Sequence, residues 1–359
     1  MIRRFVNLVV ESGGYSSRVC SLHRLDVAKH LFYPSTADAE AANASKNNNN
    51  NNGSGDGADK QKPKPKPSTI DRLRRLPPAS MHFPTDADYD EDMPAVGGGE
   101  GRILHVGATG HGRLVYDADG RSVITVPSLD EPNGSSPIAI SIAGGYENSF
   151  QVLDFGQQHP RAWQPLPLPP PPPLAGDGSS SSVTSYTVVD GGRAICASCD
   201  WEVTHCFDTA GGEKRHAGDW PLPFRGRAEY VPELNTWLGF FPGKPNHLCA
   251  TDLSGIPAMN EATKLQHVVL SRRFPRYLLH RTKSWETMSR HLVNLGSGRF
   301  CIARVFAVIQ KEWIGFDVDD SHEDWFAVLT GVKVLSSGDD DDGEGVLRMV
   351  KHVQTLSVQ

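Results

Sequence analysis

The sequence contains no long apolar run, no excess of positive charge and no secretory signal. No segment approaches the roughly 20 apolar residues of a transmembrane helix, so we expect no membrane association. The net charge of −6 argues against a general nucleic-acid-binding protein. The N-terminus lacks an apolar core followed by a small-residue cleavage site, which argues against secretion.

A regular cysteine spacing is also absent. The six cysteines of the 359-residue chain follow no disulfide-framework pattern, so we predict reduced thiols in a cytosolic or nuclear protein. Arg3 and Arg4, with no acidic residue before Glu11, leave organelle targeting open as an alternative. We expect Phe5–Val10 to form a strand, because its residues suit a strand better than an amphipathic targeting helix.

Motifs for nucleotide or metal binding are missing too. The glycines of VGATGHG, residues 106–112, are followed by neither the lysine nor the helix of a phosphate-binding loop. The acidic, glycine-rich segment 85–101 does not match the spacing of a calcium-binding EF-hand. We therefore assign no catalytic, cofactor-binding or metal-binding residues and expect no cofactor.

What the sequence does contain is a repeat. From Tyr186 to Val231, an apolar run ends at Gly191–Gly192, and a second run covers Ala194 to Ala197. A third run ends in His205–Asp208, and Trp220 follows before a proline-rich exit. Short apolar strands, glycine turns and a late aromatic residue are typical of one four-stranded blade of a kelch-type propeller.

A second copy of this pattern lies upstream, in Ile138–Leu168, with its glycine pair about 47 residues earlier. In addition, apolar residues lead into an aspartate and a turn in four segments. These are Leu114–Gly120, Gln151–Gly156, His205–Gly212 and Cys249–Gly255. We predict that each aspartate shapes its turn, because its carboxylate can accept hydrogen bonds from the backbone N–H groups that follow.

These repeats predict an all-β, kelch-like β-propeller with disordered inserts. Between five and seven four-stranded blades fit the length, and six is our prediction. Residues 1–34 are expected to supply strands that close the propeller, residues 35–68 a disordered low-complexity linker, and residues 69–359 the propeller body. Inserts are expected at 85–101, 165–185 and 338–345. Within the body, Asp117–Gly120 and Gly296–Gly298 are predicted hairpin turns, and Trp325–Leu335 either pairs with His291–Ile309 or opens the last blade.

The central repeat carries one possible metal site. Cys196 and Cys199 lie near Cys206, His205 and His216, residue types that bind zinc. Residues three apart on a strand point to opposite faces, so a zinc site would need a turn between the two cysteines. We favour buried structural cysteines and keep zinc binding as an alternative.

Three further segments could recruit partners. The polyproline run Pro165–Leu174 could dock on an aromatic groove, and the Lys-Pro repeats within 35–68 could bind an acidic partner. The segment Ser271–Lys283 alternates basic and aromatic residues, as some RNA-binding segments do. For each one we favour a solvated loop or linker.

Several motifs resemble one known family. They are RRFVNLVV, SLHRLD and LFYP near the N-terminus, then TVVDGG, FDT and HAGDWPLPFRGRAEYVPEL, and finally HLVNLGSGRFCIAR and FAVLTGV. This pattern resembles a plant family, chiefly of grasses, that is described as a domain of unknown function, number 1668. The resemblance covers nearly the whole chain outside the low-complexity segments. It implies a kelch-like propeller and supplies no active-site residues.

Together these observations predict a monomeric protein-interaction module that binds another protein through blade loops, without nucleic acid. The alternative is an enzyme whose site lies at the propeller channel. A cluster of His, Asp, Glu and Arg at one mouth of the channel would favour the enzyme, whereas apolar residues and glycines there would argue against it.

Overall fold

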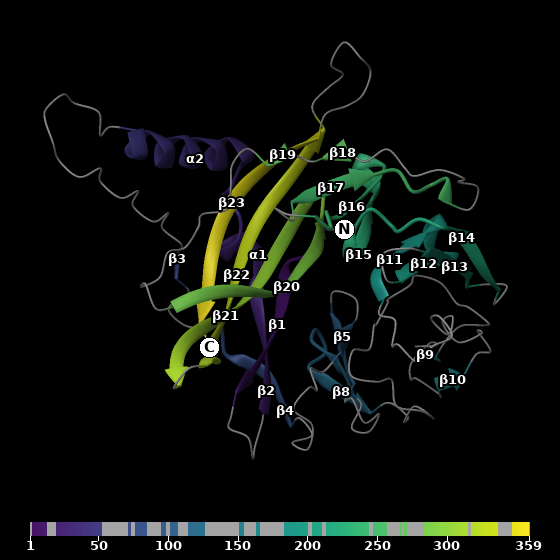
Figure 1. The fold of residues 1–359 in the computed structure, drawn as a ribbon, viewed down its shortest axis with the longest axis horizontal. Coiled ribbons are helices and arrows are strands. Elements are labelled where there is room, and N and C mark those ends of the chain that lie inside the picture. The colour runs from purple at the N-terminus through teal and green to yellow at the C-terminus, as the bar shows by residue number, and fades with distance from the viewer. Residues whose placement is uncertain are drawn as a thin grey trace, which may run out of the picture.

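Antiparallel strands make up most of the regular structure (Figure 1). The computed structural model describes residues 2–12, 19–51, 71–72, 76–84, 95–97, 101–106, 114–125, 151–153, 163–165, 183–199, 203–209, 213–243, 247–256, 266–267, 269–270, 283–314, 317–336 and 347–358. Within these ranges the helices are α1 (Val27–His30), α2 (Thr36–Asn51) and the 3-10 turns η1 (Asp190–Gly192) and η2 (Pro232–Leu234). The predicted all-β class is confirmed.

The first part of the chain forms three sheets. The N-terminal sheet has the order β1-β2-β4, with β1 at Phe5–Ser12, β2 at Val19–Asp26 and β4 at Ala79–Pro84. A four-stranded meander follows, with β5 at Ala95–Gly97, β6 at Arg102–Val106, β7 at Leu114–Asp117 and β8 at Ser122–Thr125. Strands β9 (Gln151–Leu153) and β10 (Trp163–Pro165) pair with each other.

The middle of the chain forms one eight-stranded sheet that consists of two meanders. The first contains β11 (Val183–Val189), β12 (Ala194–Cys199), β13 (Val203–Asp208) and β14 (Lys214–Gly218). The second contains β15 (Arg225–Val231), β16 (Thr236–Phe240), β17 (Leu248–Thr251) and β18 (Gln266–His267). Their first strands, β11 and β15, run parallel and join the two meanders. Two first strands in parallel are the arrangement expected when four-stranded units repeat about an axis.

The C-terminal sheet is a meander of longer strands. These are β20 (Lys283–Gly296), β21 (Arg299–Ile314), β22 (Asp317–Ser336) and β23 (Leu347–Val358). The short strands β19 (Val269–Leu270) and β3 (Asp71–Arg72) each pair in parallel with β23. Of the two arrangements left open by the sequence, the first is confirmed: Trp325–Leu335 lies within β22, which pairs directly with β21.

Glycine and aspartate shape the turns as predicted. Gly191, Gly296 and Gly298 adopt positive φ angles of 64°, 84° and 67° in the turns that follow β11 and β20. The Asp117 carboxylate accepts hydrogen bonds from the backbone N–H groups of Asp119 and Gly120, at 3.0 and 2.8 Å. Asp252 accepts one from the N–H of Ser254 in the same way.

Apolar side chains pack several of these sheets against one another. Cys20 and Leu22 of β2 contact Ile103 of β6 and Tyr116 of β7. The opposite face of the N-terminal sheet packs on the C-terminal sheet. That core is formed by Val6, Leu25, Val27, Leu31, Phe32, Leu295, Cys301 and Leu329. Leu22 and Leu25, three residues apart on β2, therefore serve opposite faces, as strand geometry requires.

Two further apolar cores join the C-terminal sheet to β15–β17 and β15–β17 to the first meander. The other face of the C-terminal sheet packs on β15–β17. That core contains Val231, Leu238, Phe240, Leu248, Ala250, Leu292, Phe300, Ile302, Val332, Val334 and Met349. The remaining face of β15–β17 packs on the first meander of the eight-stranded sheet. Its core contains Val189, Ala194, Cys196, Cys206, Leu222, Phe224, Ala228, Trp237, Cys249, Leu253 and Ile256. The N-terminal sheet, the C-terminal sheet and β15–β17 are thus covered by apolar contacts on both faces.

Backbone hydrogen bonds also tie the N-terminal segment to the C-terminal sheet. The N–H of Arg3 donates to the carbonyl of Leu295, and the N–H of Val353 donates to the carbonyl of Leu31. Gly331 of β22 lies so close to α1 that a Cβ atom there would overlap the Leu31 carbonyl oxygen. Side chains larger than hydrogen are therefore disfavoured at residue 331.

Helix α2 corrects the prediction for the low-complexity segment 35–68. Residues 36–51 are helical, because alanine favours helix and Ser35 caps the first turn. The Ser35 hydroxyl accepts a hydrogen bond from the Asp38 N–H at 3.1 Å. The Asn43 amide donates to the Lys351 carbonyl at 2.7 Å, and Arg348 pairs with Glu40 at 2.7 Å, so the helix rests on β23. Residues 52–68 lie outside the described residues.

The structure describes parts of two of the three predicted inserts. Segment 85–101 contains β5, so part of it belongs to a sheet, where it pairs with β6. Segment 165–185 begins in β10 and ends in β11, and its residues 166–182 lie outside the described residues. Segment 338–345 lies entirely outside them.

His352 on β23 gives the fold a pH dependence that can be measured. Its side chain is buried, and its imidazole lies 4.8 Å from the ring of Phe32. Neither ring nitrogen has a hydrogen-bond partner among the described residues. Burial lowers the pKa of His352 to about 4, helped by the positive charges of Arg299 and Lys333.

We expect the free energy of unfolding to fall as the pH is lowered from about 6.5, the unfolded pKa of histidine, to about 4. In this window the unfolded chain binds a proton at His352 that the folded chain excludes, so protonation favours unfolding. The contribution is about 3 kcal/mol at the acid end. Urea denaturation of wild type and His352→Leu across this range isolates it, because the variant lacks this part of the pH slope. Identical slopes in both proteins would contradict the assignment.

Candidate functional site

The first strands of the two meanders, β11 and β15, bring a tyrosine and several charged residues close together. Tyr186 of β11 is the register partner of Arg227 on the parallel strand β15. Gly226, with φ of 71°, interrupts the regular pairing of β15 with β16 and separates Arg225 from Arg227. Glu229 follows on the same strand and forms an ion pair with Arg227 at 3.4 Å.

Strands β20 and β21 bring two more arginines to this place. Arg290 and Arg304 lie directly opposite each other in the antiparallel register. They share a sheet face with Leu292 and Ile302, two residues away on each strand, and this is the face that packs on β15–β17. Arg225 lies opposite Phe240, which belongs to the same core. The arginines therefore lie at the border of the interface between the two sheets.

We call Tyr186, Arg225, Arg227, Glu229, Arg290 and Arg304 the leading-strand cluster. It contains four arginines and one carboxylate, and Arg227 already pairs with that carboxylate. Arg290 is half-buried, and its Nε atom has no hydrogen-bond partner among the described residues. Burial lowers the pKa of Arg290, and the charge of Arg225 adds to the effect. The cluster thus holds a surplus of positive charge within a partly desolvated place.

Tyr186 adds a hydrogen-bond donor to the cluster. Burial raises the pKa of its phenol, while the charge of Arg227 partly opposes the shift. Its hydroxyl group therefore keeps its proton at neutral pH. A neutral phenol beside guanidinium groups can donate a hydrogen bond to an anion, whereas it is a poor general base.

The turns that follow β15 and β20 form a second notable region, which we call the hairpin rim. The Ser297 N–H donates to the Glu233 carboxylate at 2.8 Å, so the two turns are in contact. Beside them, the Tyr230 ring lies 4.6 Å from the Trp237 ring, and its hydroxyl donates to the Asn235 side chain at 2.8 Å. Tyr230 is 39% exposed. The hairpin rim therefore presents a pre-ordered aromatic side chain to solvent.

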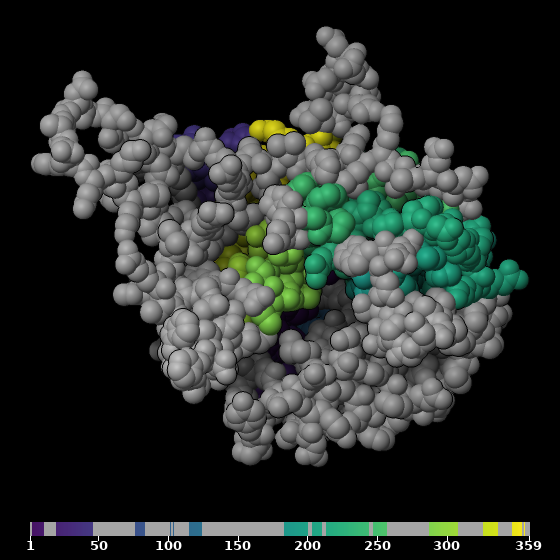
Figure 2. Space-filling model, in the orientation of Figure 1, coloured from purple at the N-terminus to yellow at the C-terminus, as the bar shows by residue number. Residues whose placement is uncertain are grey.

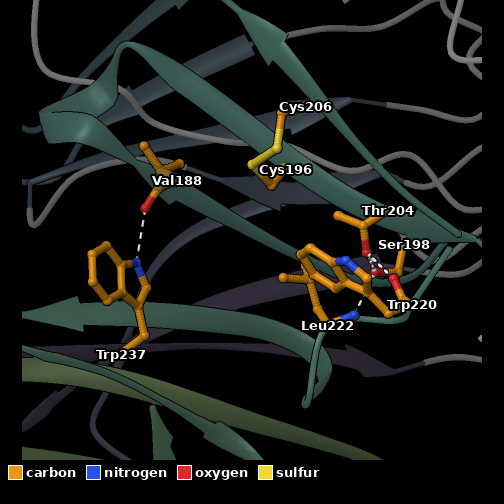
Figure 3. Close-up of a disulfide and its surroundings, with 8 residues drawn as sticks. All are labelled: Val188, Cys196, Ser198, Thr204, Cys206, Trp220, Leu222 and Trp237. Carbon is orange, nitrogen blue, oxygen red and sulfur yellow. Dashed lines mark hydrogen bonds between the residues drawn. A yellow bond between two sulfur atoms is a disulfide. The ribbon is translucent and has the colours of Figure 1, made fainter. Parts of the chain in front are cut away.

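The cysteines of the central repeat are arranged differently from our prediction (Figure 3). Cys196 on β12 and Cys206 on β13 are register partners and form a disulfide. The expectation of six reduced thiols is therefore wrong for this pair. Strand pairing places two sequence-distant cysteines side by side, which their spacing does not reveal. Cys20, Cys199, Cys249 and Cys301 are buried and form no disulfide.

The same sheet shows why the proposed zinc ligands do not gather. Cys199 lies on the face opposite Cys196 and Cys206, and the sulfur atoms of these two are bonded to each other. His205 and His216 are neighbours, with ring centroids 5.6 Å apart, and His216 also contacts the Asp219 carboxylate at 2.8 Å. Over the part of the chain that the structure describes, no three potential ligands are placed to hold a metal ion.

Hydroxyl groups near the disulfide fix the segment that follows β14 and leads out of this meander. The hydroxyl groups of Ser198 and Thr204 lie 2.8 Å apart, and Thr204 donates to the Trp220 carbonyl at 2.6 Å. The Leu222 N–H donates to Ser198 at 2.7 Å, and the Trp237 indole N–H donates to the Val188 carbonyl at 3.0 Å (Figure 3). These bonds are structural, because each joins neighbouring segments of the buried core.

The other sequence candidates fall mainly outside the described residues. This is true of the Lys-Pro repeats, of Pro165–Leu174 after its first residue, and of Ser271–Lys283 before its last. Among the helices that the structure describes, none combines the length and apolar character needed to cross a membrane.

Comparison with known proteins identifies the family. Residues 3–357 match the family described as "Protein of unknown function (DUF1668)". The chain belongs to this family. The match confirms the family expected from the sequence motifs, and it extends from β1 to β23. A search among curated proteins finds no match.

Among solved structures, the chain is similar to the β-propeller domain of Cps50 (Swd1) from Myceliophteria thermophila. The identity is 11%, the alignment covers 72% of each chain, and the TM-score is 0.24. The architecture of this DUF1668 chain therefore has to be argued from its own strand order and cores.

The leading-strand cluster was not predicted from the sequence. Arg225 and Arg227 read as part of a linker, and Arg290 and Arg304 were not singled out. A signal was present nonetheless, because Arg304 interrupts the apolar run from Phe300 to Ile309. A charged residue inside such a strand often marks a site, since burying it without a partner is costly.

The disulfide makes a testable contribution to stability. Cys196 and Cys206 are separated by 10 positions, and closing a loop of this size constrains the unfolded chain by about 3 kcal/mol. We expect Cys196→Ala/Cys206→Ala to unfold at a lower urea concentration than the oxidised wild type, with no response to dithiothreitol. Wild type with and without dithiothreitol is the control. Equal stability of the oxidised and reduced wild type would contradict this role.

Proposed function

We propose that this chain is a protein-interaction module built on a kelch-like β-propeller of six sheets. The observation that carries the proposal is the order in which the cores join the sheets. Counted from β5, the six units are β5–β8, β9–β10, the two meanders β11–β14 and β15–β18 of the eight-stranded sheet, the C-terminal sheet β20–β23, and the N-terminal sheet. Sheets that follow one another in this series, from β11–β14 onwards, pack face to face.

The last contact joins the N-terminal sheet to the β5–β8 sheet, the first unit of the series. The N-terminal sheet packs on β6 and β7, and Arg24 donates to the Ala118 carbonyl at 2.8 Å. This contact supports a closed circle of sheets, in which residues 1–34 would act as the closure that the sequence predicted. The cores among the described residues include no residue of β9–β10, so its place in the series follows from chain order alone.

A propeller of this kind binds partners through the loops at its ends. The hairpin rim suits such a role, because tyrosine is enriched at the energetic centres of protein interfaces and Tyr230 is exposed. Tyr230 is held in place by Trp237 and Asn235, so little conformational freedom would be lost on binding. We propose a protein partner, a monomeric chain, no nucleic-acid partner, and a location in the cytosol or nucleus.

An enzyme remains the second candidate. The leading-strand cluster places one Glu, one Tyr and several Arg together. A cluster of His, Asp, Glu and Arg is the feature expected to favour an enzyme over an interaction module. Its excess of arginine over carboxylate favours binding an anion over general acid–base chemistry. Turnover of a negatively charged substrate that is lost in Glu229→Gln would favour the enzyme.

The interaction role is tested with a variant of the hairpin rim. Full-length wild type, Tyr230→Ala and Val123→Ala serve as baits in quantitative affinity purification, since Val123 is 50% exposed on β8 and serves as the matched control. We expect the recovery of at least one partner to fall about 30-fold with Tyr230→Ala alone, which corresponds to the loss of about 2 kcal/mol typical of a hot spot. Thermal denaturation checks that both variants fold. Recovery of the same partners by all three baits would contradict the proposal.

A further inference from the structure

The leading-strand cluster combines positive charge with partial burial. Its cations come from β15, β20 and β21, and these strands meet where the C-terminal sheet packs on β15–β17. Figure 2 shows the described parts of these two sheets side by side on one face of the molecule, in lime and green. The charge therefore extends across a junction between sheets.

Among the described residues, no ion pair offsets the charges of Arg225 and Arg290. Glu229 pairs with Arg227, and the Nε atom of Arg290 has no hydrogen-bond partner there. Arg225 raises the local potential further, because its charge acts on Arg290. Like charges brought together in a partly desolvated place are destabilising unless an anion joins them. Such an arrangement suits a binding site for a negatively charged ligand.

Apolar side chains flank the cations. Phe306 lies two residues from Arg304 on the same strand face, and its ring stacks on Phe326 at 5.2 Å. Met288, two residues before Arg290, is 43% exposed. A ligand that reaches both arginines would also contact apolar surface. This mixture suits a peptide with acidic and apolar side chains better than a hydrated small anion.

We propose that the leading-strand cluster binds an acidic peptide segment of the partner, with its carboxylates on Arg225 and Arg290 and apolar side chains against Met288 and Phe306. Arginine matches carboxylates through paired N–H···O bonds, and Tyr186 supplies another donor. The inference rests on the proposed interaction function and names the chemistry of the partner. An extended strand presents side chains on one face at every second residue, so acidic and apolar residues in an extended peptide can reach neighbouring subsites.

Fluorescence anisotropy tests the inference directly. The probe is a labelled peptide that alternates Glu and Leu, and the matched probe has Gln in place of Glu. We expect the full-length chain to bind the Glu peptide at least about tenfold more tightly than the Gln peptide, with affinity falling as salt is added. Arg225→Gln and Arg290→Gln should each weaken binding about tenfold or more. Arg193→Gln, an exposed arginine in the turn after β11, should leave it unchanged.

The outcomes separate the alternatives. If Arg290→Gln does not fold, Arg225→Gln still decides the question, because Arg225 is exposed. Equal binding by wild type and Arg225→Gln, or equal binding of the two probes, would overturn the inference. Inorganic phosphate that binds with the same dependence on arginine, when the peptide does not bind, would assign the site to a small oxyanion and overturn the peptide. If partner binding depends on Tyr230 but not on Arg225 or Arg290, the proposed interaction function is retained and the acidic-peptide site is rejected.

Discussion

Face-to-face apolar packing between sheets is the constraint on which the rest of this structure depends. A four-stranded sheet with apolar side chains on both faces has to be covered twice, and each neighbour here covers one face. Leu22 and Leu25 show the principle within one strand, since they are fully buried against different sheets. Burying a leucine side chain contributes about 2 kcal/mol, so a sheet without one neighbour would lose much of its stability.

The sequence predicted the local elements well, because turn chemistry is local. Gly191 and Asp117 act at the turns where they were expected. The errors concern contacts between distant residues. The Cys196–Cys206 disulfide depends on strand register, which the cysteine spacing does not encode. Helix α2 rests on β23, roughly 300 residues later in the chain, and its composition alone indicated disorder.

The candidate site illustrates the same limit. Arg225 and Arg290 lie far apart in sequence and meet because two sheets share a core. Neither residue belongs to a motif with a known chemical role, so their chemistry becomes visible when the packing is known. Such a site also explains how charge can be concentrated without disturbing the fold. The apolar contacts of Leu292, Ile302 and Phe240 hold the sheets together, and the arginines occupy the border.

Hydrogen exchange in Leu22→Ala and Leu25→Ala tests most directly whether the N-terminal sheet joins the β5–β8 sheet to the C-terminal sheet. The account predicts that Leu22→Ala speeds amide exchange in β6 and β7, and that Leu25→Ala speeds it in β21 and β22, because each leucine supports one interface. Faster exchange confined to β1 and β2 in both variants would contradict it, because the N-terminal sheet would then support neither neighbour.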